Sequence, residues 1–143
     1  MPEKSIKIFI VDDHDILRDG LKYVMSSDGF AEIIEEARSG KEFIEKIKKG
    51  VDADIILLDI AMPEMNGIDA CIEALKIKPD LKIIALSMYE DRKYYNKMIK
   101  SGIMGIVFKT SGIDELKKAI ETVNNGENYF TDFDEIMKGS DPF

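Results

Sequence analysis

Short apolar runs alternate with amphipathic stretches along most of this chain, and the alternation restricts the folds open to it. After the first apolar run, Leu17, Leu21 and Val24 recur with the spacing of one helix face. The same order, an apolar run and then a helical pattern, occurs five times. Regular β–α alternation predicts a parallel sheet with helices on both of its faces. The expected strands are residues 7–11, 31–35, 55–58, 82–86 and 106–108.

The strand runs differ in polarity, which indicates where each lies in the sheet. The third, fourth and fifth runs are apolar throughout, whereas the second, AEIIEEA, is more polar and suits a sheet edge. The helical stripes include Ile72 and Ile99, which are therefore expected to face the core. We predict an α/β fold, a doubly wound five-stranded parallel sheet with five helices, over residues 1–125. Residues 126–143 lose the periodicity and are predicted to form a turn and a linker.

Composition excludes several classes of function. The 143 residues suffice for one domain with a sizeable core. A net charge of −8 argues against nonspecific nucleic-acid binding, because the phosphate backbone attracts a basic face. Cys71 is the single cysteine, so a reducing cytoplasm without internal disulfides is the expected setting. No apolar run approaches the roughly 18 residues of a transmembrane helix, so no membrane association is expected.

Polar residues follow four of the strand runs at the point where each run ends. Asp12 and Asp13 follow the first, Asp59 the third, Ser87 the fourth and Lys109 the fifth. Because ligands bind beyond the carboxyl ends of parallel strands, these side chains are expected to converge at one edge. Clustered carboxylates favour a divalent cation such as Mg²⁺. An Asp carboxylate can also attack phosphorus, with the metal and the lysine supplying positive charge and the serine bonding a phosphoryl oxygen.

Three segments together resemble the receiver domain of bacterial two-component response regulators. IFIVDDHDILRDGL is similar to the family's first strand, acidic pair and first helix, and LLDIAMPEMNGID to its phosphoacceptor segment. ALSMYEDRKYYNKMIKSGIMGIVFK resembles the stretch from its fourth strand to its fifth-strand lysine. The resemblance covers about residues 5–125, and the ordered set of motifs is far more specific than any single one. It implies a flavodoxin-like (CheY-like) sheet with strand order 2-1-3-4-5.

The resemblance also implies a role for each acid of the site. Asp59 would be the phosphoacceptor and also one of the metal ligands. Asp13 would bind Mg²⁺, or Mn²⁺ in its place, and Asp12 would assist directly or through a water molecule. The backbone carbonyl of Ala61 would complete the protein's share of the metal ligands.

The same resemblance implies how the site would respond to phosphorylation. Ser87 would turn toward the phosphoryl group, and Lys109 would pair first with Asp59 and then with its phosphate. The donor would be a phosphohistidine of a sensor histidine kinase or a small acyl phosphate. The domain would act as a switch, with only self-directed phosphotransfer and dephosphorylation, rather than as an enzyme.

The last part of the chain narrows the resemblance. FKTSGIDELKKAIETVNNGENYFT is similar to the LuxR-type transcriptional regulators, although Lys-Thr stands where many receivers have Lys-Pro. Such regulators imply a homodimer, and DNA binding through a C-terminal helix-turn-helix domain that is absent from this chain. The chain stops about where the linker would begin, so we expect a truncated protein, with a natural single-domain protein as the alternative.

One position departs from the family pattern. Many receivers carry Tyr or Phe three residues before the lysine, a ring that moves inward on activation, and here that residue is Ile106. By strand alternation, Phe108 is expected to point to the opposite face from Lys109 and Ile106. We therefore expect activation to act mainly through Ser87 and the loop at residues 88–92.

Three other functions share part of the pattern. A degenerate receiver that binds partners without phosphorylation is consistent with Ile106 but not with a complete site. A haloacid-dehalogenase-like phosphatase would need a second Asp where Ala61 stands, and a flavodoxin-like flavin binder would not explain the five polar residues. His14, the single histidine, is expected to be an exposed loop residue rather than a ligand or a phosphohistidine.

Overall fold

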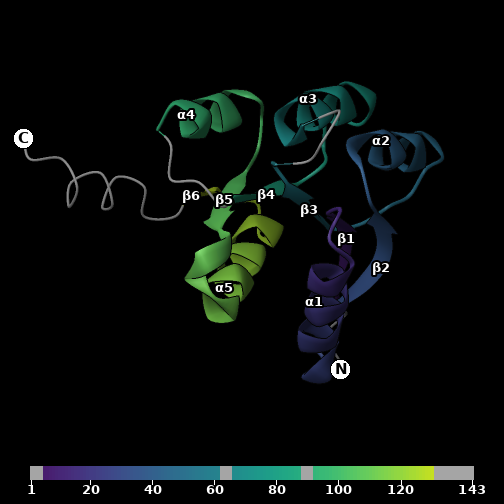
Figure 1. Cartoon of the computed structure of the whole chain (residues 1–143), viewed down its shortest axis with the longest axis vertical. Helices are drawn as coiled ribbons and strands as arrows, with labels where there is room; N and C mark the ends of the chain where they lie inside the picture. The colour runs from purple at the N-terminus through teal and green to yellow at the C-terminus, as the bar shows by residue number, and fades with distance from the viewer. Residues whose placement is uncertain (1–4, 62–65, 88–91, 131–143) are drawn as a thin grey trace, which may run out of the picture.

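The computed structural model describes residues 5–61, 66–87 and 92–130, and its elements follow the predicted order (Figure 1). Parallel strands lie in the order β2-β1-β3-β4-β5-β6, which confirms the predicted order and extends it by one strand. The strands are β1 (Ile6–Val11), β2 (Ala31–Ala37), β3 (Ile55–Asp59), β4 (Ile83–Ser87), β5 (Gly105–Phe108) and β6 (Tyr129–Phe130). The helices are α1 (Asp15–Ser27), α2 (Gly40–Lys48), α3 (Gly67–Ile77), α4 (Arg92–Lys100) and α5 (Ile113–Asn124), with a 3₁₀ turn at Lys109–Ser111.

Helices cover both faces of the sheet. α1 and α5 lie on one face, and α2, α3 and α4 lie on the other (Figure 1). β1 shows how strand alternation serves both layers: Ile8 and Ile10 join the core with α1 and α5, whereas Phe9 and Val11 join the core on the opposite face. All four are completely buried, which explains why the strand shows an unbroken apolar run instead of alternation.

The register of the strands aligns the ends that carry the polar residues. Val11 lies opposite Leu58, so Asp12, which follows it, stands level with Asp59. Ser87 ends β4 one position beyond the level of Asp59. The more polar β2 lies at the edge beside β1, as its composition predicted. One edge of the sheet therefore gathers the side chains of the predicted site.

β6 was not anticipated from the sequence, which predicted only a turn and a linker after residue 125. Tyr129 pairs with Gly105 and Phe130 with Ile106, so β6 adds a short parallel strand beside β5. The Tyr129 hydroxyl also donates a hydrogen bond to the Glu115 carboxylate on α5. A two-residue strand is too short to show a period, so only its tertiary contacts reveal it. The end of the receiver domain and the linker beyond it stay predictions.

Two expectations about side-chain direction were wrong. Phe108 lies in the same core layer as Ile106, while Val107 lies in the opposite layer, because residues two apart in a strand share a face. Ile72 and Ile99 were expected to face the core, but they are 40% and 38% exposed. Each sits at the border of its helix stripe, where a periodic count cannot separate the buried face from its margin.

Two helices begin with side-chain caps that fix the strand-to-helix turns. Ser39 caps α2 by accepting a hydrogen bond from the Glu42 amide, and Asn66 caps α3 by accepting one from the Asp69 amide. Across the described ranges, none of the helices has the length and apolar character that crossing a membrane requires.

Candidate functional site

One lysine bridges two buried carboxylates at the carboxyl edge of the sheet. Lys109 Nζ lies 3.2 Å from Asp12 Oδ2 and 3.3 Å from Asp59 Oδ1. Asp12 and Asp59 are 0% and 1% exposed, although charged side chains are rarely buried so completely. β1, β3 and the turn after β5 supply the three groups, so residues far apart in sequence meet as predicted.

The two oxygens of Asp59 have different surroundings. Oδ1 accepts a hydrogen bond of 3.1 Å from the Ala61 amide and faces Lys109, whereas buried Oδ2 has no hydrogen-bond partner in the described part of the chain. Burial, followed by repulsion from Asp12, raises the pKa of Asp59 above its ordinary value, against the opposing pull of Lys109. The ionised carboxylate is therefore under-stabilised, and a further cation would relieve it.

Four side chains are close enough to share one metal ion. Ligand atoms of Asp12, Asp13, His14 and Asp59 lie within 4.8 Å of one another. The Asp13 side chain is 30% exposed, so the cluster opens to solvent on that side. Carboxylate oxygens suit hard cations such as Mg²⁺, and the unsatisfied Asp59 oxygen provides a further donor. The donor set therefore fits the predicted divalent cation.

His14 takes a larger part in the cluster than the sequence suggested. Its ring is 65% exposed, as expected for a loop residue. Its Nδ1, however, lies 2.9 Å from Asp12 Oδ1 and 3.2 Å from Asp13 Oδ1. The hydrogen bond and charge of Asp12, followed by the charge of Asp13, raise the pKa of His14. The signal in the sequence was its position directly after the acidic pair.

Ser87 and Ala61 both lie at the edge of the sheet near Asp59. Ser87 is buried at the end of β4, beside the strand that carries Asp59. Ala61 follows that strand and turns its amide back onto the Asp59 carboxylate. Its carbonyl as a metal ligand, and the turn of Ser87 toward phosphate, stay predictions. Much of the predicted switch loop, residues 88–91, and the Met-Pro segment, residues 62–65, lie outside the described residues.

Gly67 packs against the strand that carries Asp59. A Cβ at Gly67 would come within 2.5 Å of the Asp59 carbonyl oxygen and 2.7 Å of the Ile60 Cα. Its amide also donates a hydrogen bond of 3.0 Å to the Ile60 carbonyl. The glycine of the quoted phosphoacceptor segment therefore lets α3 begin directly against the site, a role that the sequence alone did not assign.

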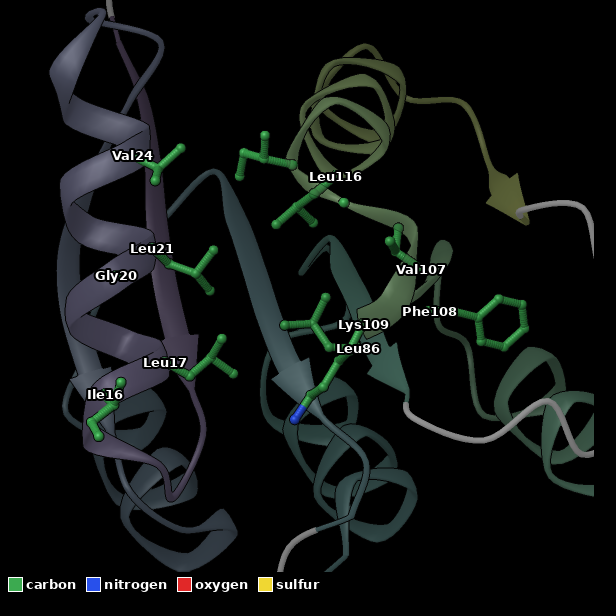
Figure 2. A pocket seen from close by; sticks show the side chains of 12 residues that line it. Ile16, Leu17, Gly20, Leu21, Val24, Leu86, Val107, Phe108, Lys109 and Leu116 are labelled. Atoms are coloured by element: carbon green, nitrogen blue, oxygen red, sulfur yellow. The ribbon is translucent and has the colours of Figure 1, made fainter.

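An apolar groove adjoins the site between α1 and α5. It has a volume of about 410 Å³, and Figure 2 shows Leu17 and Leu21 of α1 facing Leu116 of α5 across it. Leu86 and Lys109 also line it, so the bridging lysine belongs to both the groove and the acidic site.

Comparison with known proteins agrees with this geometry. The family model described as response regulator receiver domain matches residues 8–121. Transcriptional regulatory protein DegU of Brevibacillus brevis is 32% identical over 89% of this chain and 53% of its own length. Transcriptional regulatory protein MctR of Rhizobium johnstonii is 34% identical over 96% of this chain and 67% of its own length. The chain thus spans about half to two thirds of these relatives.

A solved structure leads to the same fold. The crystal structure of a DNA-binding response regulator of the LuxR family from Staphylococcus aureus superposes with a TM-score of 0.76. It is 26% identical and covers 84% of this chain and 99% of the compared chain. The predicted resemblance is confirmed by the family match, the two relatives and the shared fold. This chain belongs to the response regulator receiver domain family.

Proposed function

We propose that this chain is a phosphorylation-activated switch that accepts a phosphoryl group on Asp59. The observation that carries the proposal is the setting of the Asp59 carboxylate. Lys109 and the Ala61 amide hold one oxygen, while the buried second oxygen has no hydrogen-bond partner among the described residues. A carboxylate held in this way keeps a lone pair for attack on phosphorus.

The neighbouring side chains supply what phosphoryl transfer needs. One Asp59 oxygen forms the bond to phosphorus, while the bond from phosphorus to the donor nitrogen or oxygen breaks and the leaving group takes its electron pair. Lys109, 3.3 Å from Asp59, neutralises charge on the carboxylate and then on the phosphoryl oxygens. Ser87 donates its hydroxyl proton in a hydrogen bond to a phosphoryl oxygen once the group is attached. Positioning and charge neutralisation account for this reaction.

The acids would hold the divalent cation. Asp13 and Asp59 would bind Mg²⁺ directly, Asp12 would be a direct or water-mediated ligand, and the Ala61 carbonyl would complete the set. Support comes from ligand atoms gathered within 4.8 Å and from the raised pKa of Asp59, which burial and then Asp12 cause. When bound, Mg²⁺, or Mn²⁺ in its place, supplies positive charge to the transferring phosphoryl group.

The switch would serve a two-component system that regulates transcription. The phosphoryl donor is a sensor histidine kinase, and the output is a helix-turn-helix domain joined to the receiver. DegU and MctR are both transcriptional regulatory proteins, which supports regulation of transcription, and the LuxR-family structure supports the type of output domain. Homodimer formation on phosphorylation and a cytoplasmic location belong to the same proposal.

Intact mass after incubation with acetyl phosphate and Mg²⁺ tests the proposal. We expect the protein to gain one phosphoryl group, and Asp59→Asn, or removal of Mg²⁺ with chelator, to abolish the gain. Asp80→Asn is the matched control, because Asp80 is an exposed acid outside the site. Equal labelling of the wild type and Asp59→Asn would contradict the assignment of Asp59.

A second function, partner binding without phosphorylation, is favoured by one observation. Ile106 fills the position of the usual mobile aromatic residue and is completely buried. Under this alternative, acetyl phosphate and the cognate kinase would both leave the mass unchanged. Beryllofluoride would then also leave the oligomeric state unchanged, whereas a working switch would respond.

A further inference from the structure

Arg18 is the only buried basic residue among the described side chains, and the proposed function assigns it no role. It lies in the second turn of α1 and is 6% exposed. Its Nη1 donates a hydrogen bond of 2.5 Å to the backbone carbonyl of Asp12. Its Nε donates one of 2.9 Å to Glu36 on β2, and its Nη2 donates to Asp15. One planar guanidinium therefore ties the end of β1 to α1 and β2.

The carbonyl that Arg18 holds belongs to the peptide between the two acids of the site. Fixing this carbonyl fixes the plane of the Asp12–Asp13 peptide, since the peptide group is rigid. The backbone amide of His14 donates a hydrogen bond of 2.8 Å to Asp12 Oδ1, which closes the turn over the carboxylate. The direction in which Asp13 leaves the strand depends on this peptide plane. Arg18 is therefore placed to set the geometry of both acids without touching either carboxylate.

The positive charge of Arg18 is neutralised by carboxylates that lie outside the acidic site. Glu36 and Asp15 both accept hydrogen bonds from the guanidinium, and Lys22 shares Glu36 at 2.6 Å. An unbalanced cation beside the acids would repel a divalent metal ion. Here two carboxylates face the guanidinium, so it can orient the backbone with little electrostatic opposition to a metal ion.

We propose that Arg18 is a positioning residue that holds Asp12 and Asp13 in the arrangement that binds the divalent cation. This inference rests on the proposed function, because it concerns the same metal site. The guanidinium supplies a fixed fork of donors, which suits one carbonyl and two carboxylates at once. A lysine would supply the charge but not the fork.

Binding of Mn²⁺ alone, followed by the electron paramagnetic resonance signal of the free ion, tests the proposal. We expect Arg18→Met to weaken Mn²⁺ binding by roughly 10- to 100-fold, as other outer-shell substitutions at metal sites do. Arg38→Met is the matched control. Arg38 also pairs with Asp15, at 2.7 Å, but its side chain is 66% exposed and its charged group binds this carboxylate rather than the backbone of Asp12. We expect the Mn²⁺ affinity of Arg38→Met to differ from that of the wild type by less than about 3-fold.

A second readout uses the metal-free protein. Arg18→Met should shift the NMR signals of the Asp12, Asp13 and His14 amides, whereas Arg38→Met should leave them in place. Affinities are measured well below the melting temperature of each variant, so that global unfolding does not contribute. If Arg18→Met does not fold, Arg18→Lys replaces it, and a loss of the same order is expected because the fork is missing.

The outcomes separate this inference from the function on which it rests. Wild-type affinity in Arg18→Met or Arg18→Lys would overturn the positioning role and leave the phosphorylation switch intact. A wild-type protein that binds no Mn²⁺ would overturn the metal site and the inference together. Weaker binding in the Arg18 variants, with normal binding in Arg38→Met, would support the proposal.

Discussion

Two groups of acidic side chains lie near Arg18, and they differ in how far basic side chains neutralise their negative charge. The edge pocket contains Asp12, Asp13 and Asp59, with Lys109 bridging two of them. In the β2 network every acidic residue lies within ion-pair distance of at least one basic residue. Its members are the acids Asp15, Asp19, Glu35, Glu36 and Glu42 and the bases Arg18, Lys22, Arg38 and Lys46.

The pKa shifts follow this difference in charge balance. In the network, a hydrogen bond from Lys46 is the main reason why the pKa of Glu35 lies below its ordinary value. Burial pushes the pKa of Glu36 upward, but hydrogen bonds from Lys22 and Arg18 outweigh it and lower the pKa overall. In the edge pocket, burial and then Asp12 raise the pKa of Asp59. The same functional group is thus stabilised as an anion in one region and penalised in the other.

The comparison teaches how to recognise a binding site among many charges. A matched network stabilises the fold and leaves no group for a ligand. An unmatched pocket lowers the stability of the free protein, which is tolerated where a ligand supplies the missing charge. Substitutions that restore or remove balance should therefore act in opposite directions in the two regions.

Removing the bridging lysine should give the largest change. Lys109→Met leaves Asp12 and Asp59 buried without the ammonium group, and we expect the free energy of unfolding to fall by about 3–5 kcal/mol. The loss should shrink toward pH 4, because Asp59, whose pKa burial already raises, can then take up a proton. Urea unfolding at pH 7 and at pH 4 measures both effects.

Lys46→Met provides the control in the network. Lys46 keeps part of its surface exposed and pairs with Glu35 and Glu42. Its loss should cost only about 0.5–1 kcal/mol, because solvent screens partly exposed pairs. Equal losses in the two variants would show that the pocket and the network do not differ in charge balance.

Removing an acid from the pocket should have the opposite sign. Asp59→Asn should raise the free energy of unfolding in metal-free buffer by about 1–3 kcal/mol. The substitution replaces a buried charged carboxylate, one of whose oxygens has no hydrogen-bond partner among the described residues, by a neutral amide. The folded protein holds the Asp59 proton more tightly than the unfolded chain does. The penalty of the wild-type residue is therefore absent below its ordinary pKa of about 3.9, grows as the pH rises to the folded value, and is complete above it.

Thermal melting measures the higher stability of Asp59→Asn. Each kcal/mol should raise the melting temperature by roughly 2–4 °C in a domain of this size. Saturating Mg²⁺ should narrow the difference, since it stabilises the wild type by binding the folded state alone. A lower melting temperature for Asp59→Asn in metal-free buffer would contradict the view that Asp59 carries unbalanced charge.

The sequence predicted the scaffold of the pocket because the scaffold depends on local patterns. Unbroken apolar runs indicated central strands, and polar residues at the ends of those runs indicated the edge. Asp12, Asp59 and Lys109 meet because parallel strands bring their carboxyl ends together, so topology alone was sufficient to predict their proximity.

The sequence could not predict contacts that depend on side-chain reach. The three bonds of Arg18 need the distance between α1, β1 and β2, and the fit of Gly67 against Asp59 needs the approach angle of α3. β6 is too short to carry a periodic signal. The direction of Phe108 was readable from the sequence, and the error there came from misapplied strand alternation.

A substitution in the network should destabilise where Asp59→Asn stabilises. Glu36→Gln removes the carboxylate that Arg18 and Lys22 share, and we expect a loss of about 1 kcal/mol at pH 7. The folded pKa of Glu36 is lowered, so its contribution is present above the unfolded value near 4.3 and is lost as the pH falls through the folded value. Urea unfolding between pH 7 and pH 3 measures this. A Glu36→Gln variant as stable as the wild type at pH 7 would show that the network contributes no net stability.

The smallest effect should come from the outer part of the network. Glu35→Gln removes one of several partners of Lys46, whose ammonium group still reaches the Glu36 carbonyl at 2.6 Å and Glu42 at 3.3 Å. Because the remaining contacts hold Lys46 in place, we expect a loss of only about 0.3–0.5 kcal/mol. Adding 1 M salt should reduce this loss further, since the pair is about one third exposed. A loss as large as that of Lys109→Met would mean that charge pairs over β2 are as tightly coupled as those of the pocket, and the contrast between the two regions would fail.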